Sequence, residues 1–448
     1  MKTTTHSLMV ALAAALFLLA PLATWAQVAE VSGVPSKKEI VRSLDGRYSI
    51  AYSNDAGLNC FVLDDPYTQP LRFSLPATML VNDIEVDGDN VFFCGSMGPH
   101  GMIGHFDWKK VFWYNDRVYF TVCNSDYSSE GHYIHIDNYT RMDYFYDITS
   151  GRHVLALVGN SVVDDYLLLN RTVVAAASTT TLYPPSSWAF RYLYNKDGKI
   201  TYTDIAALDR SVVAVGHHDG RGCYLRTFKK DDIFPSHPYD TAFATEILLA
   251  GVPAVGPSLV EGIAPDVVTV VHQGTGTTTV GHRLFVDPST GAVSSAANSY
   301  YFTTLSALSS FDLYDLRFDK ELYLLEDADH LAAGVTSRWL DMLPTTTSPA
   351  AIDCHRLLIG RQTTLDVNPQ NLKPITAGSS PSGLLSMYRP LNIGTTTTCS
   401  VHHSLGLTYL YPTKERLSVS FNDPSQNYTS LPPFLPVIIN ATAPVICP

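Results

Sequence analysis

The 448-residue sequence predicts an all-β protein, on three observations. Strand-forming residues are abundant, with 25 tyrosines and 19 phenylalanines beside many valines and threonines. The apolar runs are short, and 28 glycines and 27 prolines separate them. Helical periodicity is nearly absent, and the best helix candidate is the segment Ala328 to Leu343.

Apolar runs recur in pairs joined by a polar turn, and each pair predicts two neighbouring antiparallel strands. The turns are rich in Gly, Asn and Asp, as at Gly159-Asn160. In chain order the predicted pairs are 49–52 with 60–63, 91–94 with 102–106, 118–123 with 132–136, 154–158 with 166–169, 212–215 with 223–228, 267–271 with 282–286, and 322–325 with 335–340.

The spacing of these pairs indicates a repeat. Val212, Val267 and Leu322 hold the same place in their runs and follow one another at 55 residues. A period near 50 residues with a few strands per unit is typical of a β-propeller. Radial packing of the blades covers both faces of each sheet, which explains a continuous apolar run such as Val267–Val271. We therefore expect about seven blades; tandem β-sandwiches are the alternative.

The N-terminus has the features of a secretory signal peptide. Lys2 supplies a positive charge, Leu8 to Leu22 is apolar, and Thr24-Trp25-Ala26 places small residues before Gln27. The apolar run is short for a membrane anchor, which needs about 20 residues. We predict residues 1–26 as the signal peptide and residues 27–448 as a single propeller domain without a transmembrane segment. The protein would be secreted or periplasmic, with the cell surface as a further destination.

Composition excludes some classes of protein. Apolar and aromatic residues make up 46% of the chain, which is too many for a disordered chain. The formal net charge of −12 argues against nucleic acid as a partner. The seven cysteines are widely spaced and form no C-x-x-C pair, so most are expected to be buried apolar residues. Cys447 is a candidate to tie the C-terminus to an earlier strand, with Cys399 as one candidate partner.

Histidine pairs give weak candidates for metal ligands. Adjacent residues of a strand point to opposite faces, so His402-His403 could not chelate one ion in a strand, and His132 and His135 also differ in face. His217-His218 falls in a predicted turn before Asp219 and could supply two ligands there. We prefer a solvated turn, because no third ligand is identifiable.

Acidic and glycine-rich segments also have ordinary explanations. Asp83, Glu85, Asp87 and Asp89 alternate, so on one strand they would share a face that could attract calcium, but Asp87-Gly88 is a strong hairpin signal and is preferred. Gly274-Thr275-Gly276 is interpreted as a turn between strands, and residues 378–383 as a loop. The stretches 344–351 and 424–436 are predicted loops. No acidic pair for glycoside cleavage can be selected from 42 acidic residues.

Trp108, Trp113 and Tyr114 cluster after a predicted strand and could anchor a ligand, although packing between blades is the preferred interpretation.

The segment 81–95, with 101–107 after it, resembles a blade of uncharacterised secreted β-propeller-like proteins of anaerobic Gram-negative bacteria. The resemblance is clear over about one blade and implies fold and compartment, not chemistry. Position 27 lacks the cysteine that the lipoprotein members of that group carry.

Together these observations favour an exported, non-catalytic binding protein of the cell envelope or extracellular space, acting as a monomer on a protein or glycan. The sequence assigns no catalytic residue, metal ligand or cofactor, and it does not identify the ligand-binding residues. The alternative is a carbohydrate-active hydrolase or lyase whose carboxylates lie near the propeller channel.

Overall fold

A computed structural model describes residues 27–447 of the chain, apart from a set of short segments. The predicted signal peptide, residues 1–26, lies outside the described residues. So do residues 36–37, 55–56, 63–68, 124–125, 128–132, 165–168, 184–187, 194–199, 219–221, 234–243, 251–256, 275–277, 296–298, 304–311, 329–336, 346–350, 390–399, 407, 411–412, 420–427, 431, 434, 441–444 and 448.

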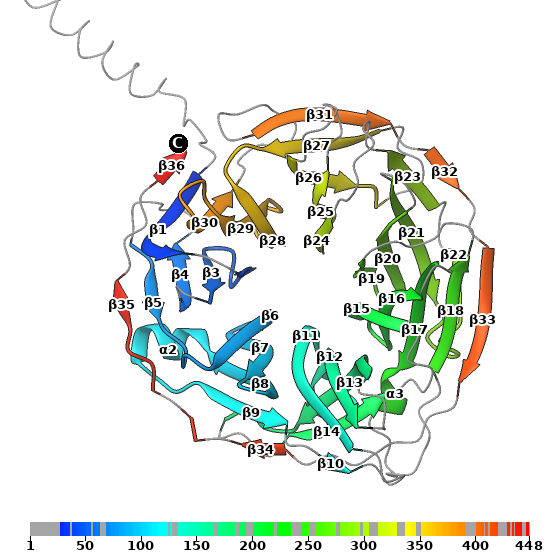
Figure 1. Ribbon diagram of the computed structural model, residues 1–448, viewed down its shortest axis with the longest axis horizontal. Helices are drawn as coiled ribbons and strands as arrows, with labels where there is room; N and C mark the ends of the chain where they lie inside the picture. The colour runs from blue at the N-terminus through cyan, green and yellow to red at the C-terminus, as the bar shows by residue number, and fades with distance from the viewer. Residues whose placement is uncertain are drawn as a thin grey trace, which may run out of the picture.

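The strands form seven antiparallel sheets, or blades, arranged in a ring (Figure 1). In the first three blades the strands run outward from the ring centre in chain order. Blade 1 contains β2 (Glu39–Ser43), β3 (Tyr48–Ser53), β4 (Gly57–Val62) and β5 (Leu71–Phe73); blade 2 contains β6 (Met79–Asp87), β7 (Asn90–Met97), β8 (His100–Asp107) and β9 (Tyr119–Cys123); blade 3 contains β11 (Tyr133–Asp147), β12 (Arg152–Asp164), β13 (Leu169–Thr179) and β14 (Ala189–Leu193), with β10 (Asp126–Tyr127) beside β11.

Blades 4 to 7 repeat this plan. Blade 4 contains β15 (Ile200–Ala207), β16 (Ser211–His218), β17 (Gly222–Lys229) and β18 (Ala244–Ala250); blade 5 contains β19 (Ser258–Ala264), β20 (Val267–Gln273), β21 (Thr278–Val286) and β23 (Ser299–Thr303), with β22 (Val293–Ser295) beside β21; blade 6 contains β24 (Asp312–Asp319), β25 (Glu321–Ala328), β26 (Ser337–Leu343) and β27 (Ala351–Leu357); blade 7 contains β28 (Arg361–Val367), β29 (Pro374–Ser379), β30 (Leu384–Arg389) and β1 (Gln27–Pro35). The predicted seven-bladed propeller is confirmed.

The two ends of the chain meet in blade 7. Strand β1, from the N-terminal part, pairs with β30 and supplies the fourth strand. Strand β36 (Val445–Cys447) then pairs with the outer side of β1. Because one blade combines strands from both ends, hydrogen bonds between strands close the ring.

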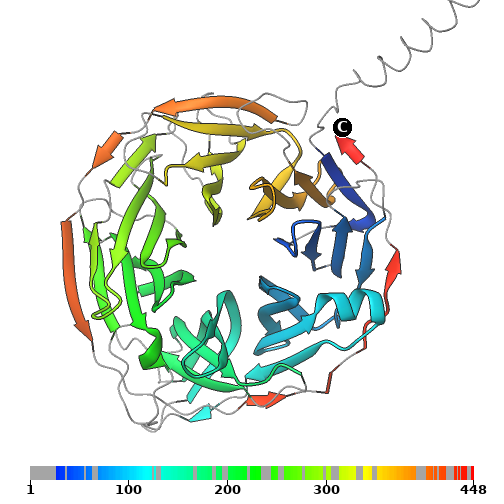
Figure 2. The same ribbon diagram turned by 180° about the vertical axis from the view of Figure 1, so that it is seen from behind.

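A belt formed by the C-terminal segment adds an outer strand to six of the seven blades (Figures 1 and 2). It follows the ring against the order of the blades, and each of its strands pairs antiparallel with the outermost strand of a blade. The belt strands are β31 (Ser400–Gly406) on blade 6, β32 (Thr408–Leu410) on blade 5, β33 (Thr413–Val419) on blade 4, β34 (Tyr428–Ser430) on blade 2, β35 (Ile439–Asn440) on blade 1, and β36 on blade 7.

The hydrophobic core is divided among the seven junctions between blades. Each buried cluster combines apolar residues of two successive blades. Strand β20 shows how one apolar run serves two junctions, because Val268 and Val270 pack with blade 4 whereas Val271 packs with blade 6. Alternate residues of a strand point to opposite faces, so a blade with neighbours on both sides needs apolar residues at successive positions.

An irregular register in the innermost strand recurs from blade to blade. In blades 2, 4 and 7 the register shifts opposite a glycine of the second strand, namely Gly95, Gly216 and Gly378. A Cβ at these positions would lie 1.8 to 2.2 Å from a carbonyl oxygen of the innermost strand. In these three blades the two strands approach so closely at the irregularity that only glycine fits on the second strand.

Most of the predicted strand pairs are confirmed, including 49–52 with 60–63, 91–94 with 102–106 and 267–271 with 282–286. The pair 118–123 with 132–136 is wrong: β9 closes blade 2, and β11 opens blade 3. The turn at Gly159-Asn160 is also wrong, because β12 continues to Asp164 and Gly159 pairs with Tyr139 beside a bulge of β11.

Two further expectations need correction. The helix candidate Ala328 to Leu343 contains the end of β25 and all of β26 in its described part. The expected loop 378–383 is a hairpin: residues 378–379 end β29, and the turn is followed by β30. The described helices are instead α2 (Trp108–Tyr114), whose first turn is capped by the Asp107 carboxylate, and α3 (Lys230–Ile233).

Candidate binding face and inner charged cluster

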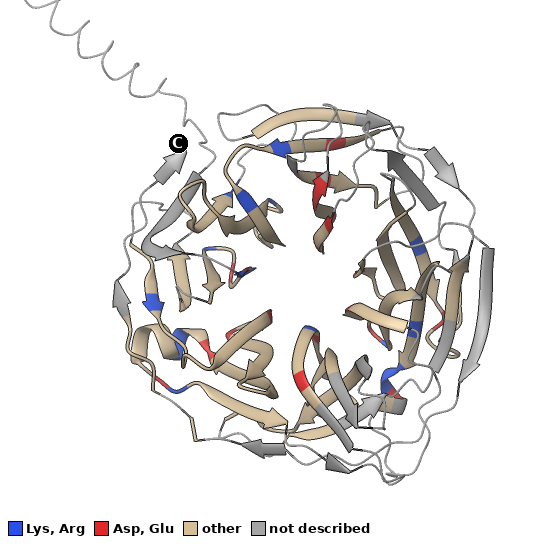
Figure 3. Ribbon diagram, in the orientation of Figure 1, with Lys and Arg blue, Asp and Glu red and all other residues tan. Residues whose placement is uncertain are grey.

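The innermost strands contain charged residues near the ring centre (Figure 3). Residues two apart share a face of a strand, so Asp83 and Glu85 both contact Arg42, at 2.7 and 3.3 Å. The predicted hairpin at Asp87-Gly88 is confirmed, since Asp87 pairs with Asn90 across the turn. We call the following residues the inner charged cluster: Arg42, Asp83, Glu85, Arg141, Asp143, Asp204, Glu261, Asp315, Arg317 and Asp366.

Aspartates of this cluster connect successive blades by accepting a backbone N–H of the next innermost strand. This contact occurs at five of the seven junctions. The pairs of carboxylate and donor residue are Asp83 with Met142 (2.9 Å), Asp143 with Ala207 (2.6 Å), Asp204 with Val260 (2.9 Å), Asp315 with Leu365 (3.0 Å) and Asp366 with Ser43 (2.5 Å). A carboxylate that accepts a backbone N–H in this way orients the two strands relative to each other.

Arginines neutralise part of this negative charge. Arg317 lies 2.9 Å from Glu85 and 3.6 Å from Asp315, and Arg141 lies 4.0 Å from both Asp204 and Asp315. Burial by itself lowers the pKa of Arg42, but the surrounding carboxylates outweigh it and leave that pKa raised. These arginines are therefore fixed cations of the ring centre.

Several carboxyl groups of the cluster have raised pKa values because burial disfavours their charged form. Burial raises the pKa of Asp204 to about 7 and those of Asp143 and Asp366 to about 6, against the opposing backbone N–H donors and cations. The pKa values of Glu85 and Glu261 are raised well above the ordinary range for the same reason. Within the described part of the chain Glu261 makes no hydrogen bond or ion pair.

The sequence contained a signal for this cluster that sequence reasoning missed. Asp83, Asp143, Asp204, Asp315 and Asp366 are each followed by an apolar or aromatic residue. They are 60, 61, 111 and 51 residues apart, and the third interval spans two blades. An aspartate that recurs once per blade therefore marks the innermost strands. Their polar residues had made these strands unlike the apolar core strands.

The histidine candidates for metal ligands lie in strands or contact neighbouring side chains. His217 and His218 lie in β16 rather than in a turn, so the preferred solvated turn is wrong, and so is the turn that the alternative ligand pair needed. His402 Nε2 lies 3.0 Å from the Asp353 carboxylate, whereas the His403 ring packs against Trp339. His132 lies outside the described residues. Among those described, no group of three His, Cys, Asp or Glu residues is placed to hold a metal ion.

Five of the cysteines are buried, as expected for small apolar residues. They are Cys60, Cys94, Cys123, Cys223 and Cys354. Burial raises the pKa of each thiol for which a shift is resolved, so those thiols stay protonated. Cys399 lies outside the described residues, so its pairing with Cys447 stays a prediction. Strand β36, which contains Cys447, is held against β1 by backbone pairing.

One face of the ring carries the hairpin turns between first and second strands together with α2 and α3; we call it the turn face. Exposed aromatic and apolar side chains gather on its elements in blades 2, 3 and 5. The exposed fractions are 44% for Trp113, 80% for Tyr114, 49% for Tyr146, 86% for Ile148 and 37% for Phe285. Exposed side chains of this kind mark interaction sites when they gather on one surface.

Helix α2 contains both buried and exposed aromatic residues. Trp108 is 1% exposed, and its indole N–H donates to the Gly88 carbonyl at 3.2 Å. The Trp113 ring packs edge-on against Trp108 and Tyr48, with centroids 5.3 Å apart in each case. Packing between blades, the preferred interpretation of the sequence, therefore holds for Trp108 and, through Tyr48 of blade 1, for one side of Trp113. Trp113 is still partly exposed, and Tyr114 is largely exposed.

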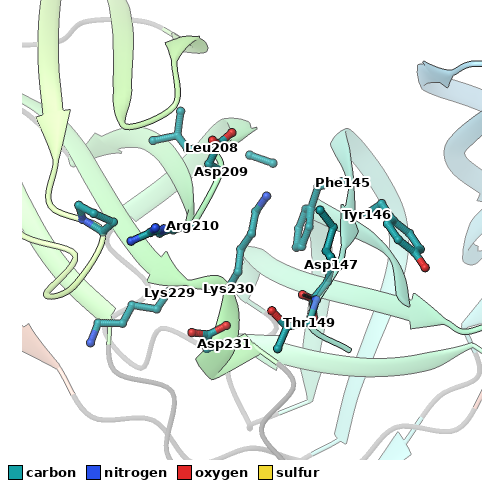
Figure 4. Close-up of a pocket in the computed structure, with 13 residues that line it drawn as sticks. Phe145, Tyr146, Asp147, Thr149, Leu208, Asp209, Arg210, Lys229, Lys230 and Asp231 are labelled. Atoms are coloured by element: carbon teal, nitrogen blue, oxygen red, sulfur yellow. Dashed lines mark hydrogen bonds between the residues drawn. The ribbon is translucent and has the colours of Figure 1, made fainter. Parts of the chain in front are cut away.

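A cavity of about 730 Å³ opens between blades 3 and 4 on the turn face (Figure 4). Its size is in the range of small-molecule sites. Lys230 extends into it between Phe145 and Leu208 (Figure 4). The remaining lining residues are Tyr146, Asp147, Ile148, Thr149, Ala207, Asp209, Arg210, Lys229, Asp231 and Pro288.

Comparisons with known proteins identify no family for the chain. No protein-family model matches the chain, and no curated protein matches it. One solved structure to which it is similar comes from a structural and mechanistic study of two prolyl endopeptidases. The TM-score is 0.38 at 12% sequence identity, over 86% of this chain and 50% of that chain, so the match spans half the length of the endopeptidase. No helix of the described residues is both long and apolar enough to cross a membrane.

Proposed function

We propose that the chain is an exported, non-catalytic binding protein whose turn face takes up a protein or glycan. The supporting observation is the contrast between the ring centre and this face. At the centre, five aspartates hold neighbouring blades together. On the turn face, exposed aromatic side chains lie on the same surface as an open cavity, and aromatic residues are frequent anchors of binding sites.

The test is a screen of purified residues 27–448 against glycans and cell-envelope proteins. We expect the double variant Trp113→Ala with Tyr114→Ala to weaken binding at least about tenfold, because exposed aromatic anchors are the residues that cost most on truncation. The matched control is Leu358→Ala. Leu358 is 50% exposed and follows β27 at the opposite face of the ring. An equal loss in both variants would contradict the assignment of the turn face.

Export is part of the proposal and has its own test. Expression of the full chain in a Gram-negative host, followed by N-terminal sequencing of the recovered protein, is expected to give Gln27 as the first residue. A first residue near Met1 in protein recovered from the cytoplasm would contradict the export proposal.

A hydrolase remains the second candidate because of Glu261. Its carboxyl group has a strongly raised pKa and no hydrogen-bond or ion-pair partner among the described residues. Asp204 lies on the neighbouring innermost strand β15, and Asp143 lies on β11, the innermost strand of the next blade beyond it. A protonated carboxyl group beside ionisable ones is the arrangement of a general acid. Release of reducing sugar from a glycan, abolished by Glu261→Gln and kept in the Trp113 variant, would establish this candidate instead.

A further inference from the structure

The amine of Lys38 contacts the side-chain amide of Asn82 in the neighbouring blade. Lys38 directly precedes β2 of blade 1, whereas Asn82 lies in β6 of blade 2, 44 positions later in the chain. Lys38 Nζ donates a hydrogen bond to Asn82 Oδ1. Lys38 is partly buried, and Asn82 is only 5% exposed. Within the described part of the chain Lys38 forms no ion pair, so its observed partner is an amide oxygen rather than a carboxylate.

The Asn82 amide is held in one orientation by blade 3. Its Nδ2 donates to the Tyr139 carbonyl at 2.6 Å and to Asn138 Oδ1, both on β11. Asn82 is also the extra residue at the irregular register of β6, between Val81 and Asp83. With its nitrogen fixed toward blade 3, the amide presents its oxygen to Lys38. The electrophilic carbon lies one C=O bond, about 1.23 Å, beyond that oxygen.

The electrostatic surroundings favour the neutral form of the Lys38 amine. Burial and then Arg141 lower its pKa to about 8, although Cys94 and Asp83 act in the opposite direction. The Asp83 carboxylate is already paired with Arg42 at 2.7 Å and accepts a backbone N–H of β11 at 2.9 Å. A neutral amine has a free electron pair and is the nucleophilic form of lysine.

We propose that Lys38 and Asn82 form an isopeptide bond within the folded chain. The neutral Nζ attacks Cγ of Asn82, and the bond from Cγ to Nδ2 breaks. One amine proton passes to the departing nitrogen, which leaves as ammonia. The products are a secondary amide and ammonia, so the step needs no oxidant, metal or co-reactant. The positive charge of Arg141 favours the negative charge that develops on Oδ1 during the attack.

Such a bond would connect blades 1 and 2 covalently. Lys38 follows β1, the strand that closes the ring, by three residues, so the bond lies near the point of closure. A cross-link between distant positions stabilises a fold by restricting the unfolded chain. The bond forms whether or not the turn face takes up a ligand, and its test is therefore independent of the proposed function.

Mass spectrometry of purified residues 27–448, after incubation at pH 8, tests the proposal. We expect a mass about 17 Da below that of the sequence, which is the mass of ammonia. Trypsin should then release residues 38–42 joined to residues 73–109, because these peptides contain Lys38 and Asn82 and are otherwise separate.

Variants separate the covalent bond from the hydrogen bond. Lys38→Arg keeps a cation and a hydrogen-bond donor but removes the nucleophile, so it should show its full sequence mass and no joined peptides. It should also melt at least about 5 °C lower, with unchanged circular dichroism before melting. Asn82→Ala should likewise show its full mass. Lys37→Arg is the matched control, and it should keep both the loss of ammonia and the joined peptides.

Two outcomes overturn the inference. The first is a full sequence mass for residues 27–448, which would leave an ordinary hydrogen bond between Lys38 and Asn82. The second is a loss of ammonia without joined peptides. A succinimide formed at Asn82 loses the same mass but leaves the Lys38 amine free. Because the joined peptides are sought in the unaltered sequence, this result does not depend on whether a variant folds.

Discussion

At the scale of single residues, the inner carboxylates both stabilise and destabilise the fold. Asp204 accepts the Val260 N–H at 2.9 Å and lies beside Arg141, which favours its charged form. Burial acts more strongly in the other direction and raises its pKa to about 7. Its charged form therefore costs stability, and that cost grows as the pH rises from the unfolded pKa near 3.8 through the folded value.

Asp204→Asn should consequently stabilise the protein at pH 8 and leave it nearly unchanged at pH 4. The amide oxygen can still accept the Val260 N–H, while the cost of the buried charge is removed. A shift of about three pKa units corresponds to at most about 4 kcal/mol, and we expect about 1–3 kcal/mol because Arg141 loses a partner. Denaturant unfolding of both proteins at the two pH values measures the difference. The same change in stability at both pH values would disprove this explanation.

The negative charge of Asp315, in contrast, is compensated by hydrogen-bond donors and a nearby arginine. Its carboxylate accepts the Leu365 N–H at 3.0 Å and the Thr364 hydroxyl at 2.9 Å, and it lies 3.6 Å from Arg317. Asp315→Ala leaves these groups without their partner and should cost about 3–5 kcal/mol of unfolding free energy. The exposed Asp312, on the same strand, is the control, and its replacement by alanine should change the free energy by less than about 0.5 kcal/mol.

At the scale of elements, glycines in the second strands of blades 2, 4 and 7 give the innermost strand room for its irregular register. Gly216→Ala would place a Cβ 2.2 Å from the Thr201 carbonyl oxygen, which belongs to the backbone and has little freedom to move. We expect a loss of about 2–3 kcal/mol by chemical denaturation. Gly262→Ala is the matched control, since its Cβ would lie 3.1 Å from the flexible end of Leu208 and at an ordinary contact distance of 3.7 Å from the Ala207 carbonyl oxygen. Equal losses in the two variants would show that close approach to the backbone is not the cause.

The same elements show what could be predicted from sequence. The second strands of the blades were found because they are buried on both faces, as Val268 to Val271 are, and their 55-residue step revealed the ring. The innermost strands were missed because their aspartates and arginines suggested turns. The error at Gly159 has the same origin, because a glycine that accommodates a bulge cannot be distinguished from a turn glycine by local pattern.

The pairing of strands from distant segments could not be predicted from the sequence either. Strand β36 pairs with β1 although more than 400 residues separate them, and β35 has only two residues. Such short segments carry no periodicity of their own. The candidate site was predicted only in part. Trp113 and Tyr114 stood out as aromatic residues in the sequence. The environment of Lys230 could not be predicted, because its amine packs on the ring of Phe145, which lies 85 positions earlier in the chain.

At the scale of the whole molecule, β1 and the belt have different structural roles. Strand β1 completes blade 7 and closes the ring, whereas the belt covers outer edges of blades that are already complete. An uncovered edge strand exposes unpaired backbone groups and invites pairing with another chain. Loss of the belt should therefore affect association more than folding.

Deletion of residues 400–448 tests this division. We expect the shortened chain to keep its β-type circular dichroism, to melt at least a few degrees lower, and to self-associate because the outer edges of β27, β23, β18, β9, β5 and β1 are uncovered. Light scattering after size exclusion measures the association. Deletion of residues 27–35 is the comparison: it opens the ring at blade 7 and should cost more stability than loss of the belt. A belt-deleted chain that stays monomeric and melts at the original temperature would show that the belt neither protects nor stabilises the blades.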